Sequence, residues 1–218
     1  MSTLVVVGMG PLVGLSLARE FGRRGYKVAM IARRKHALDG FVATLAEEGI
    51  EAVGFPADAS DRAQLQSAFG AIKARMGSID VLEYSPTEWG NGKLYPPLET
   101  TTETALGHFK LLVLGAITAV EEVLPDMLAR GKGSLLFATG TSAHRPHPFI
   151  TSLGISNAGV RNYALCLAQD LKPRGVFVAT VAIGVQVERN GTKADPDRIA
   201  EVFWKLHENQ DENDVIYA

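Results

Sequence analysis

The stretch VVVGMGPLVGLSLAREF, residues 5–21, decides the fold, because three closely spaced glycines join an apolar run to a helical pattern. Glycine lets the backbone turn tightly and approach a ligand closely, and free N–H groups at a helix start stabilise a phosphate. A strand, a glycine turn and a helix in this order are typical of a pyrophosphate site, the alternative being a purely structural turn. The residues expected to form the site are Gly8, Gly10, Pro11, Leu12, Val13 and Gly14.

The rest of the chain repeats this alternation of short apolar runs and longer helix-period segments. The runs lack the polar alternation of a half-exposed strand, which is typical of parallel strands covered on both faces. They cover residues 4–8, 26–32, 51–55, 79–84, 133–138, 176–183 and 215–218. The helical patterns between them cover residues 12–24, 36–48, 61–76, 100–130, 153–171 and 196–209. We therefore predict an α/β fold in which residues 1–218 form a single Rossmann-like domain, a doubly wound parallel sheet of about seven strands with helices on both faces.

The composition is that of an ordinary globular chain. Its 218 residues are 46% hydrophobic and 21% charged, with a net charge of -2, so no basic field attracts nucleic acid. The longest apolar run, residues 111–120, is shorter than the ~18–20 residues of a membrane span, and no basic signal segment opens the chain. We expect a cytoplasmic protein without nucleic-acid, membrane or metal partners. Cys166 lies in a helical apolar pattern and is predicted to be a buried packing residue.

Two arginines follow the second apolar run, where a site that prefers NAD would place a carboxylate for the adenine ribose. Arg33 and Arg34 can form charge-assisted hydrogen bonds with a 2′-phosphate, each worth roughly 1.5–3 kcal/mol. NADP(H) is therefore the preferred cofactor over NAD(H). The alternative is that both are exposed loop charges without a ligand.

Four motifs together resemble the short-chain dehydrogenase/reductase family, and the resemblance runs over essentially the whole chain. GMGPLVG (8–14) is similar to the coenzyme glycine motif, with Leu12 at its middle glycine. PADASD (56–61) is similar to the adenine segment, which implies contacts from Asp58 and Ala59. IDVLEYSP (79–86) and AIG (182–184) fall where the family lines the nicotinamide, which implies roles for Ser85, Pro86 and Gly184.

The resemblance also implies a catalytic tyrosine, a lysine four residues later, a serine and an asparagine. SNAGVRNYALCLAQDL is similar to the helix that carries the first pair, but the tyrosine position falls on Leu153 and the lysine position on Asn157. The asparagine position falls on Leu112. The serine position falls near residues 140–142, so a hydroxyl survives there only as Thr141 or Ser142. Positioned proton transfer contributes ~10²–10⁴-fold in rate, so ordinary carbonyl reduction is not expected.

Other groups could replace the missing proton donor. Tyr84 ends the fourth apolar run at the carboxyl edge, where ligands bind in such sheets, although aromatic residues at strand ends more often pack. Tyr163 lies ten residues past Leu153, about 15 Å further along the helix, and is expected to pack. His144 and His147 follow the fifth run, with solvated loop histidines as the default interpretation.

Three hypotheses follow. The first is a non-catalytic or regulatory NADP(H)-binding protein. The second is an atypical NADP(H)-dependent oxidoreductase for a small carbonyl or alcohol, with Thr141, Ser142, Tyr84, a histidine or solvent supplying the proton. The third is an interaction protein that no longer binds nucleotide, because the Leu12 side chain crowds the pyrophosphate.

The resemblance further implies association through the two long helices. The helix expected at residues 153–171 carries apolar residues on both sides, as it should when a sheet covers one side and a second subunit the other. We therefore expect a homodimer or homotetramer.

Overall fold

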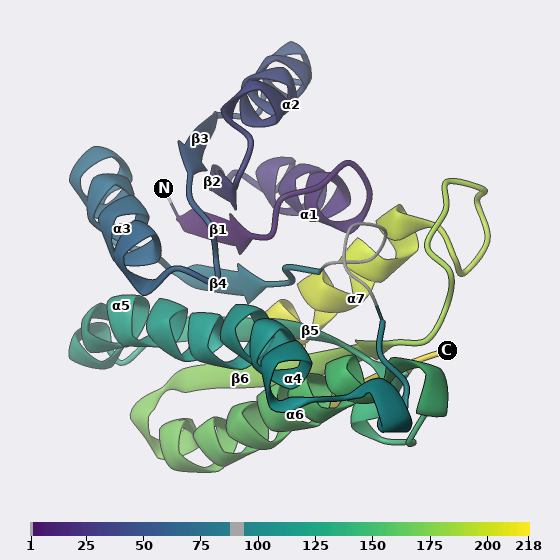
Figure 1. Cartoon of the computed structure of the whole chain (residues 1–218). Helices are drawn as coiled ribbons and strands as arrows, with labels where there is room; N and C mark the ends of the chain where they lie inside the picture. Colours follow the sequence, from purple (N-terminus) through teal and green to yellow (C-terminus); the bar gives the residue numbers. More distant parts are fainter. Residues whose placement is uncertain (1, 88–93) are drawn as a thin grey trace.

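The computed structural model describes residues 2–87 and 94–218, which form a seven-stranded parallel sheet (Figure 1). The strands are β1 (Thr3–Val7), β2 (Lys27–Ala32), β3 (Ala52–Pro56), β4 (Val81–Tyr84), β5 (Gly133–Gly140), β6 (Val176–Ile183) and β7 (Asp214–Tyr217). Their order is β3-β2-β1-β4-β5-β6-β7, and every neighbouring pair is parallel. The predicted doubly wound fold is confirmed.

Helices cover both faces of this sheet (Figure 1). The longer ones are α1 (Val13–Gly22), α2 (Lys35–Glu47), α3 (Arg62–Met76), α4 (Thr102–Phe109), α5 (Gly115–Arg130), α6 (Thr151–Leu171) and α7 (Pro196–Asn209). Single turns are η1 (Pro97–Glu99), η3 (Thr141–Ala143), η4 (Pro148–Ile150) and η5 (Lys172–Arg174), and η2 (Lys110–Leu114) is a π-helix. Among the helices in residues 2–87 and 94–218, none is long and apolar enough to cross a membrane.

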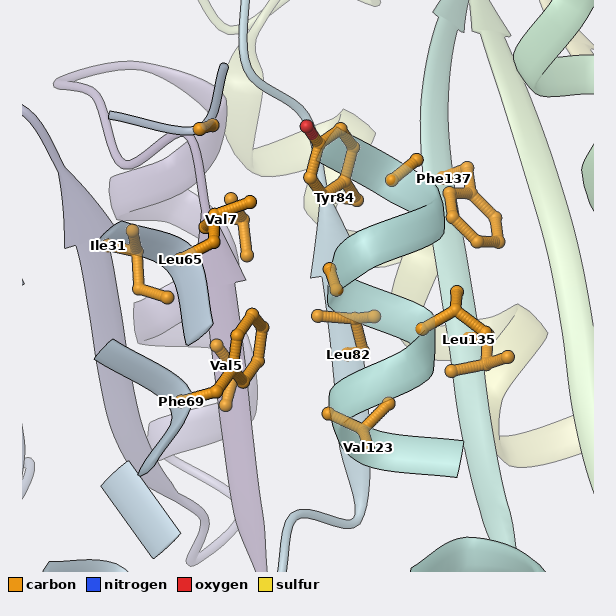
Figure 2. Close-up of a cluster of buried hydrophobic side chains, with 14 of the residues drawn as sticks. Val5, Val7, Ile31, Leu65, Phe69, Leu82, Tyr84, Val123, Leu135 and Phe137 are labelled. Carbon is orange, nitrogen blue, oxygen red and sulfur yellow. The ribbon is translucent and has the colours of Figure 1, made fainter. Parts of the chain in front are cut away.

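The pleat of the strands divides the core into two clusters. Side chains such as Val5, Leu82 and Phe137 point to the face covered by α3, α5 and α6, and Figure 2 shows them packed together. Their strand neighbours, including Val6 and Leu136, point to the face covered by α1, α2 and α7. Burying each large side chain contributes about 1.5–3 kcal/mol, so the apolar strands stabilise both layers at once.

The single helix expected at residues 100–130 is interrupted by a wider turn. The π-helix η2 separates α4 from α5, and in it the carbonyl of Leu111 accepts a hydrogen bond from the hydroxyl of Tyr84. Gly115 follows directly, and a Cβ atom there would lie 2.1 Å from that hydroxyl and 2.3 Å from the carbonyl oxygen of Ala59. The helix therefore widens where the side chain of Tyr84 enters against it.

The strand order reverses between β1 and β4, which sit side by side in the middle of the sheet. The chain leaves β1 for α1 on one face and leaves β4 toward α4 and α5 on the other. The segments that follow β1 and β4 thus leave toward opposite faces of the sheet, and ligands bind at such a point in open α/β sheets. We call the region above the carboxyl ends of these two strands the crevice.

We predict that Gly115→Ala lowers the free energy of unfolding by about 1–3 kcal/mol, because the new methyl group overpacks the Tyr84 contact. Urea unfolding measures this change. Gly107→Ala in α4 is the matched control, because nothing lies within 4 Å of its added Cβ. A helical glycine replaced by alanine there should stabilise by up to about 1 kcal/mol. Equal changes in the free energy of unfolding for the two variants would contradict the close packing of Gly115 against Tyr84.

Candidate nucleotide-binding site

The glycine turn lies at the start of the crevice and depends on Gly8. This residue has a φ of +97°, and its N–H and that of Met9 both donate to the carbonyl of Ile31 at 3.0 Å. A Cβ on Gly8 would lie 2.4 Å from the nitrogen of Pro86. Only glycine fits, so Gly8 allows the turn to cross the end of β4.

The start of α1 offers free N–H groups to this crevice. Leu12 is the N-cap residue, its side chain makes no capping hydrogen bond, and no acidic residue lies in the first turn. A Cβ on Gly10 would meet only the carbonyl oxygen of Gly8, at 3.9 Å, so that side of the turn is open. Pro11 is exposed, and Leu12 and Val13 are half-buried. The N–H of Leu15 donates to the carbonyl of Gly10 at 3.0 Å. The N–H groups of Val13 and Gly14, which precede it in the first turn, have no acceptor within the helix and are available to an anion.

Arg33 and Arg34 lie exposed after β2. Among the residues that the structure describes, neither guanidinium has an ion-pair or hydrogen-bond partner. Asp58 is half-buried after β3, and its carboxylate accepts hydrogen bonds from the N–H and the hydroxyl of Ser60, at 2.8 and 2.7 Å. Ala59 is buried beneath it. The two cations are thus free to bind a ligand, whereas one oxygen of Asp58 is already committed.

Ser85 and Pro86 follow β4 and pass beside the glycine turn. The N–H of Ser85 donates to the carbonyl of Val7 at 2.9 Å, which extends the pairing of β4 with β1. On the far side of the crevice, the N–H of Gly184 donates to the carbonyl of Tyr217 at 2.8 Å. A Cβ on Gly184 would lie 2.6 Å from a methyl carbon of Thr141, so the segment after β6 lies close to the segment after β5.

Glu83 is a site residue that the sequence analysis did not single out. It is 0% exposed in the middle of β4, and its Oε2 accepts a hydrogen bond from the hydroxyl of Ser85 at 3.0 Å. Its Oε1 has no partner among the described residues. Burial raises the pKa of Glu83 to about 8, so the carboxyl is neutral at pH 7. The available signal was one acidic residue in the apolar strand VLEY.

The structure joins two of the sequence-predicted residues, Asn157 and Ser142, at the corner between β5 and α6. The Nδ2 of Asn157 donates to the hydroxyl oxygen of Ser142 at 3.0 Å. Leu153 lies one turn earlier on α6 and is buried, and Thr141 and Ser142 are half-exposed. Leu112 is buried in η2. The polar groups at this corner are therefore a neutral amide and hydroxyls.

Tyr84 does not face the crevice, which corrects its candidacy as a proton donor. Its side chain is 1% exposed, packs beside Phe137 (Figure 2), and donates to the carbonyl of Leu111 at 2.5 Å. Burial, with Asp58 adding to it, raises the pKa of its hydroxyl far above the usual range. The pleat of β4 explains this orientation, because Tyr84 and Glu83 point to opposite faces.

Three further side chains clarify what surrounds the site. Tyr163 packs against the core, where burial raises its pKa to about 12. His144 is not a solvated loop residue, because its Nε2 lies 3.2 Å from the carboxylate of Asp214 and accepts from the Nε of Arg161 at 2.8 Å. His147 is exposed. Within residues 2–87 and 94–218, no three His, Cys, Asp or Glu side chains are placed to hold a metal ion.

Cys166 was predicted to be buried, and this is wrong for the single chain. It is exposed on α6, two residues from the buried Ala164 and Ala168 on either side. Its position on the helix turns the thiol away from the sheet. The sequence pattern could not separate a core face from an outer apolar face.

The family model described as short chain dehydrogenase matches residues 2–197, so the chain belongs to the short-chain dehydrogenase family. The very-long-chain 3-oxoacyl-CoA reductase of Anas platyrhynchos is 27% identical over 186 residues, which cover 81% of this chain and 57% of that protein. Oxidoreductase asL5 of Sarocladium schorii is 28% identical over 176 residues, or 81% of this chain and 68% of that protein. The chain thus spans little more than half the length of the first of these relatives.

Solved structures share the fold over nearly the whole chain. L-sorbose reductase from Gluconobacter frateurii, complexed with NADPH and L-sorbose, aligns with a TM-score of 0.87 at 17% identity, covering 99% of this chain and 94% of that chain. An actinorhodin polyketide ketoreductase with NADPH aligns with a TM-score of 0.87 at 22% identity, covering 99% and 95%. At these identities the likeness establishes the architecture.

The buried carboxyl of Glu83 predicts a pH-dependent stability. Its pKa is about 8 in the folded chain, whereas the ordinary pKa of an unburied glutamate carboxyl is 4.5. The folded chain thus keeps a proton that the unfolded chain releases, so this stabilisation is full below the lower value and falls as pH rises to the upper one. Across that window Glu83→Gln should gain stability over the parent by up to about 1.4 kcal/mol per pH unit.

Urea unfolding of both proteins at several pH values tests this prediction. Glu47→Gln is the matched control, because Glu47 is exposed on α2 and its surroundings change little on unfolding. A difference between Glu83→Gln and the parent that stays constant with pH would show that Glu83 is not held neutral by burial.

Proposed function

We propose that the chain binds NADP(H) in the crevice between β1 and β4 and acts as a non-catalytic or regulatory member of its family. Two features of the crevice fit a dinucleotide: the start of α1, which has no side-chain cap, and the two guanidiniums, which have no partner among the described residues. The NADPH complexes of the sorbose reductase and the polyketide ketoreductase, which share the fold, support the same cofactor class.

The preference for NADP(H) over NAD(H) rests on Arg33 and Arg34. Both lie exposed past the end of β2, at the edge of the sheet where the adenine ribose is held in dinucleotide folds. A 2′-phosphate there would replace water around two cations that have no partner in the described part of the chain. Each charge-assisted bond contributes roughly 1.5–3 kcal/mol, and NAD(H) lacks the group that would form it.

The arrangement of Leu153 and Asn157 is the observation that carries the non-catalytic proposal. Leu153 has no ionisable group, and Asn157 uses its amide to hold Ser142 rather than presenting a cation. Among the described residues near this corner, Tyr84 is bonded inside the core and Tyr163 packs further along α6. On this proposal Leu153 and Asn157 replace the tyrosine and lysine of the family, so the proton transfer worth ~10²–10⁴-fold in rate loses that donor.

One observation favours a second candidate, an atypical NADP(H)-dependent oxidoreductase for a small carbonyl or alcohol. Asn157 donates to the oxygen of Ser142, so the proton of Ser142 remains free for a ligand. Ser142 is half-exposed and could polarise a carbonyl oxygen, with Thr141 beside it. The two relatives are named as a reductase and an oxidoreductase, which supports this candidate. Such names would support it in the same way for any other member of the family.

Association and location also remain proposals. Apolar side chains are exposed along the outer side of α4, η2 and α6: Leu106, Phe109, Leu114 and Ile155. These exposed side chains support a homodimer in which the same helices of a second subunit cover them. A homotetramer would form if another face also paired. The cytoplasmic location stays a prediction from the sequence.

We predict that Arg33→Ala and Arg34→Ala each weaken NADPH binding about 10–100-fold, because each loses a charge-assisted bond to the 2′-phosphate. NADH binding should change little. Fluorescence titration of both nucleotides measures the two affinities. Arg75→Ala is the matched control, because Arg75 is exposed at the end of α3, at the opposite edge of the sheet. Equal affinity for NADPH and NADH in the parent would contradict the preference, and no binding of either would favour an interaction protein.

We also predict that the NADPH-bound protein consumes no NADPH with aldehydes, ketones or quinones above the rate without protein. Absorbance of the reduced nicotinamide measures this directly. Measurable turnover would contradict the non-catalytic proposal. If Ser142→Ala or Thr141→Val abolished that turnover while NADPH still bound, the second candidate would replace the first.

A further inference from the structure

The strand register places Glu83 one layer beneath the floor of the crevice. Val6, Glu83 and Leu136 lie opposite one another on β1, β4 and β5, and Val6 and Leu136 point toward α1 and α7. Two residues further along these strands, toward the carboxyl edge, are Gly8, Ser85 and Ala138. Since side chains alternate along a strand, these three lie on the same face, above Glu83. The floor between Glu83 and the crevice is thus made of small residues.

Among the residues that the structure describes, Ser85 alone connects Glu83 to that floor by a hydrogen bond. The carboxyl is 0% exposed, its Oε2 is bonded to the hydroxyl of Ser85, and its Oε1 has no partner in the described part of the chain. Ser85 itself is half-buried, so the residue reaches the surface while its hydroxyl bonds to the buried acid. Glu83 therefore acts on the crevice through a single hydroxyl.

In the described part of the chain, no opposite charge neutralises Glu83 from the elements packed against it. Strands β1 and β5 carry no ionisable side chain, and the side chains buried under α1 and α7 next to the sheet are mainly apolar. On α7, Asp197 bonds with Ser16 and Arg189, and His207 bonds with Ser134 and Tyr26. On α1, Arg19 and Glu20 pair with Glu48 and Arg24. Glu83 is consequently an isolated buried acid, which favours its neutral form.

The charge of Glu83 decides what Ser85 can offer to a ligand. An ionised carboxylate only accepts hydrogen bonds, so it takes the proton of Ser85 and leaves lone pairs facing the crevice. A neutral carboxyl can carry its proton on Oε2, which reverses the bond described above, so that Oε2 donates to the oxygen of Ser85. The proton of Ser85 is then free to be donated into the crevice. The same two side chains thus present either an acceptor or a donor.

We propose that Glu83 and Ser85 form a proton-controlled anion-binding pair, in which neutral Glu83 lets Ser85 donate to a phosphate oxygen and ionised Glu83 repels it. This inference rests on the proposed function, because the phosphate belongs to the dinucleotide bound between β1 and β4. An anion above the floor favours the neutral form of Glu83. Nucleotide binding therefore takes up a proton whenever Glu83 is partly ionised in the free protein.

Calorimetric titration of NADP⁺ at about pH 7, 8 and 9, in two buffers of different ionisation enthalpy, tests the pair. The carboxyl titrates near pH 8, so the Kd of the parent should rise about tenfold from pH 7 to pH 9, with proton uptake near pH 8. This range lies above the second pKa of a phosphate monoester, about 6, so titration of the 2′-phosphate itself adds little to the pH dependence of Kd.

Two variants separate the roles of the pair. Glu83→Gln cannot ionise, so its Kd should stay flat over the same range and its proton uptake should vanish. Ser85→Ala keeps the acid but loses the donor, so its binding at pH 7 should be about tenfold weaker, the equivalent of one hydrogen bond to a charged group. Part of the pH dependence should remain in Ser85→Ala, because the charge of Glu83 still repels the anion.

The outcomes distinguish this inference from the function on which it rests. The proposed role of Glu83 and Ser85 is wrong if the parent binds NADP⁺ with the same Kd at all three pH values, or if Glu83→Gln keeps the full pH dependence. Either result leaves the proposed nucleotide site unaffected. A Kd for NADP⁺ at pH 7 that is the same in Ser85→Ala as in the parent would also contradict the proposed role of the two residues. No binding by any variant at any pH would overturn the proposed function and the pair together.

Discussion

The close approach of Gly8 to the segment after β4 is the constraint on which the rest of the site depends. A positive φ and the absence of a side chain let the turn rest on the backbone of Pro86, while two N–H groups tie it to β2. This contact sets the start of α1 at the point where the strand order reverses. It also makes the floor of the crevice thin, so that Glu83 lies directly beneath it.

Most of the fold could be predicted from the sequence, because its signals are local. Apolar runs without alternation indicate strands covered on both faces, and the glycine turn identifies the first crossover. The same pattern predicts where the candidate coenzyme site lies, since the ends of β1, β2 and β4 share one edge. The interruption of the long helix by η2 could not be predicted, because it depends on Tyr84 entering from a strand more than twenty residues away.

The parts that sequence reasoning missed depend on which face a side chain meets. Tyr84 and Glu83 are neighbours in an apolar strand, and only the pleat shows that the phenol enters the core and the acid lies under the crevice. Cys166 fits a core pattern equally well on the outer side of α6. His144 lies on a loop in the sequence, but Arg161 and Asp214 come to it from a helix and an edge strand. Partners that lie far apart in the sequence cannot be predicted from local sequence patterns.

The two ends of the crevice differ in chemistry. The end near α1 and β2 offers free N–H groups, two cations and a buried acid, whereas the end near β5 and α6 offers an amide, hydroxyls and an aliphatic side chain. A crystal structure of the complex with NADPH tests this contrast most directly. We expect the phosphates at the start of α1 and at Arg33 and Arg34, and the nicotinamide end beside Ser142 and Asn157 with no phenol within hydrogen-bond distance. A nucleotide bound elsewhere, or a tyrosine and a lysine side chain at the nicotinamide, would contradict the account.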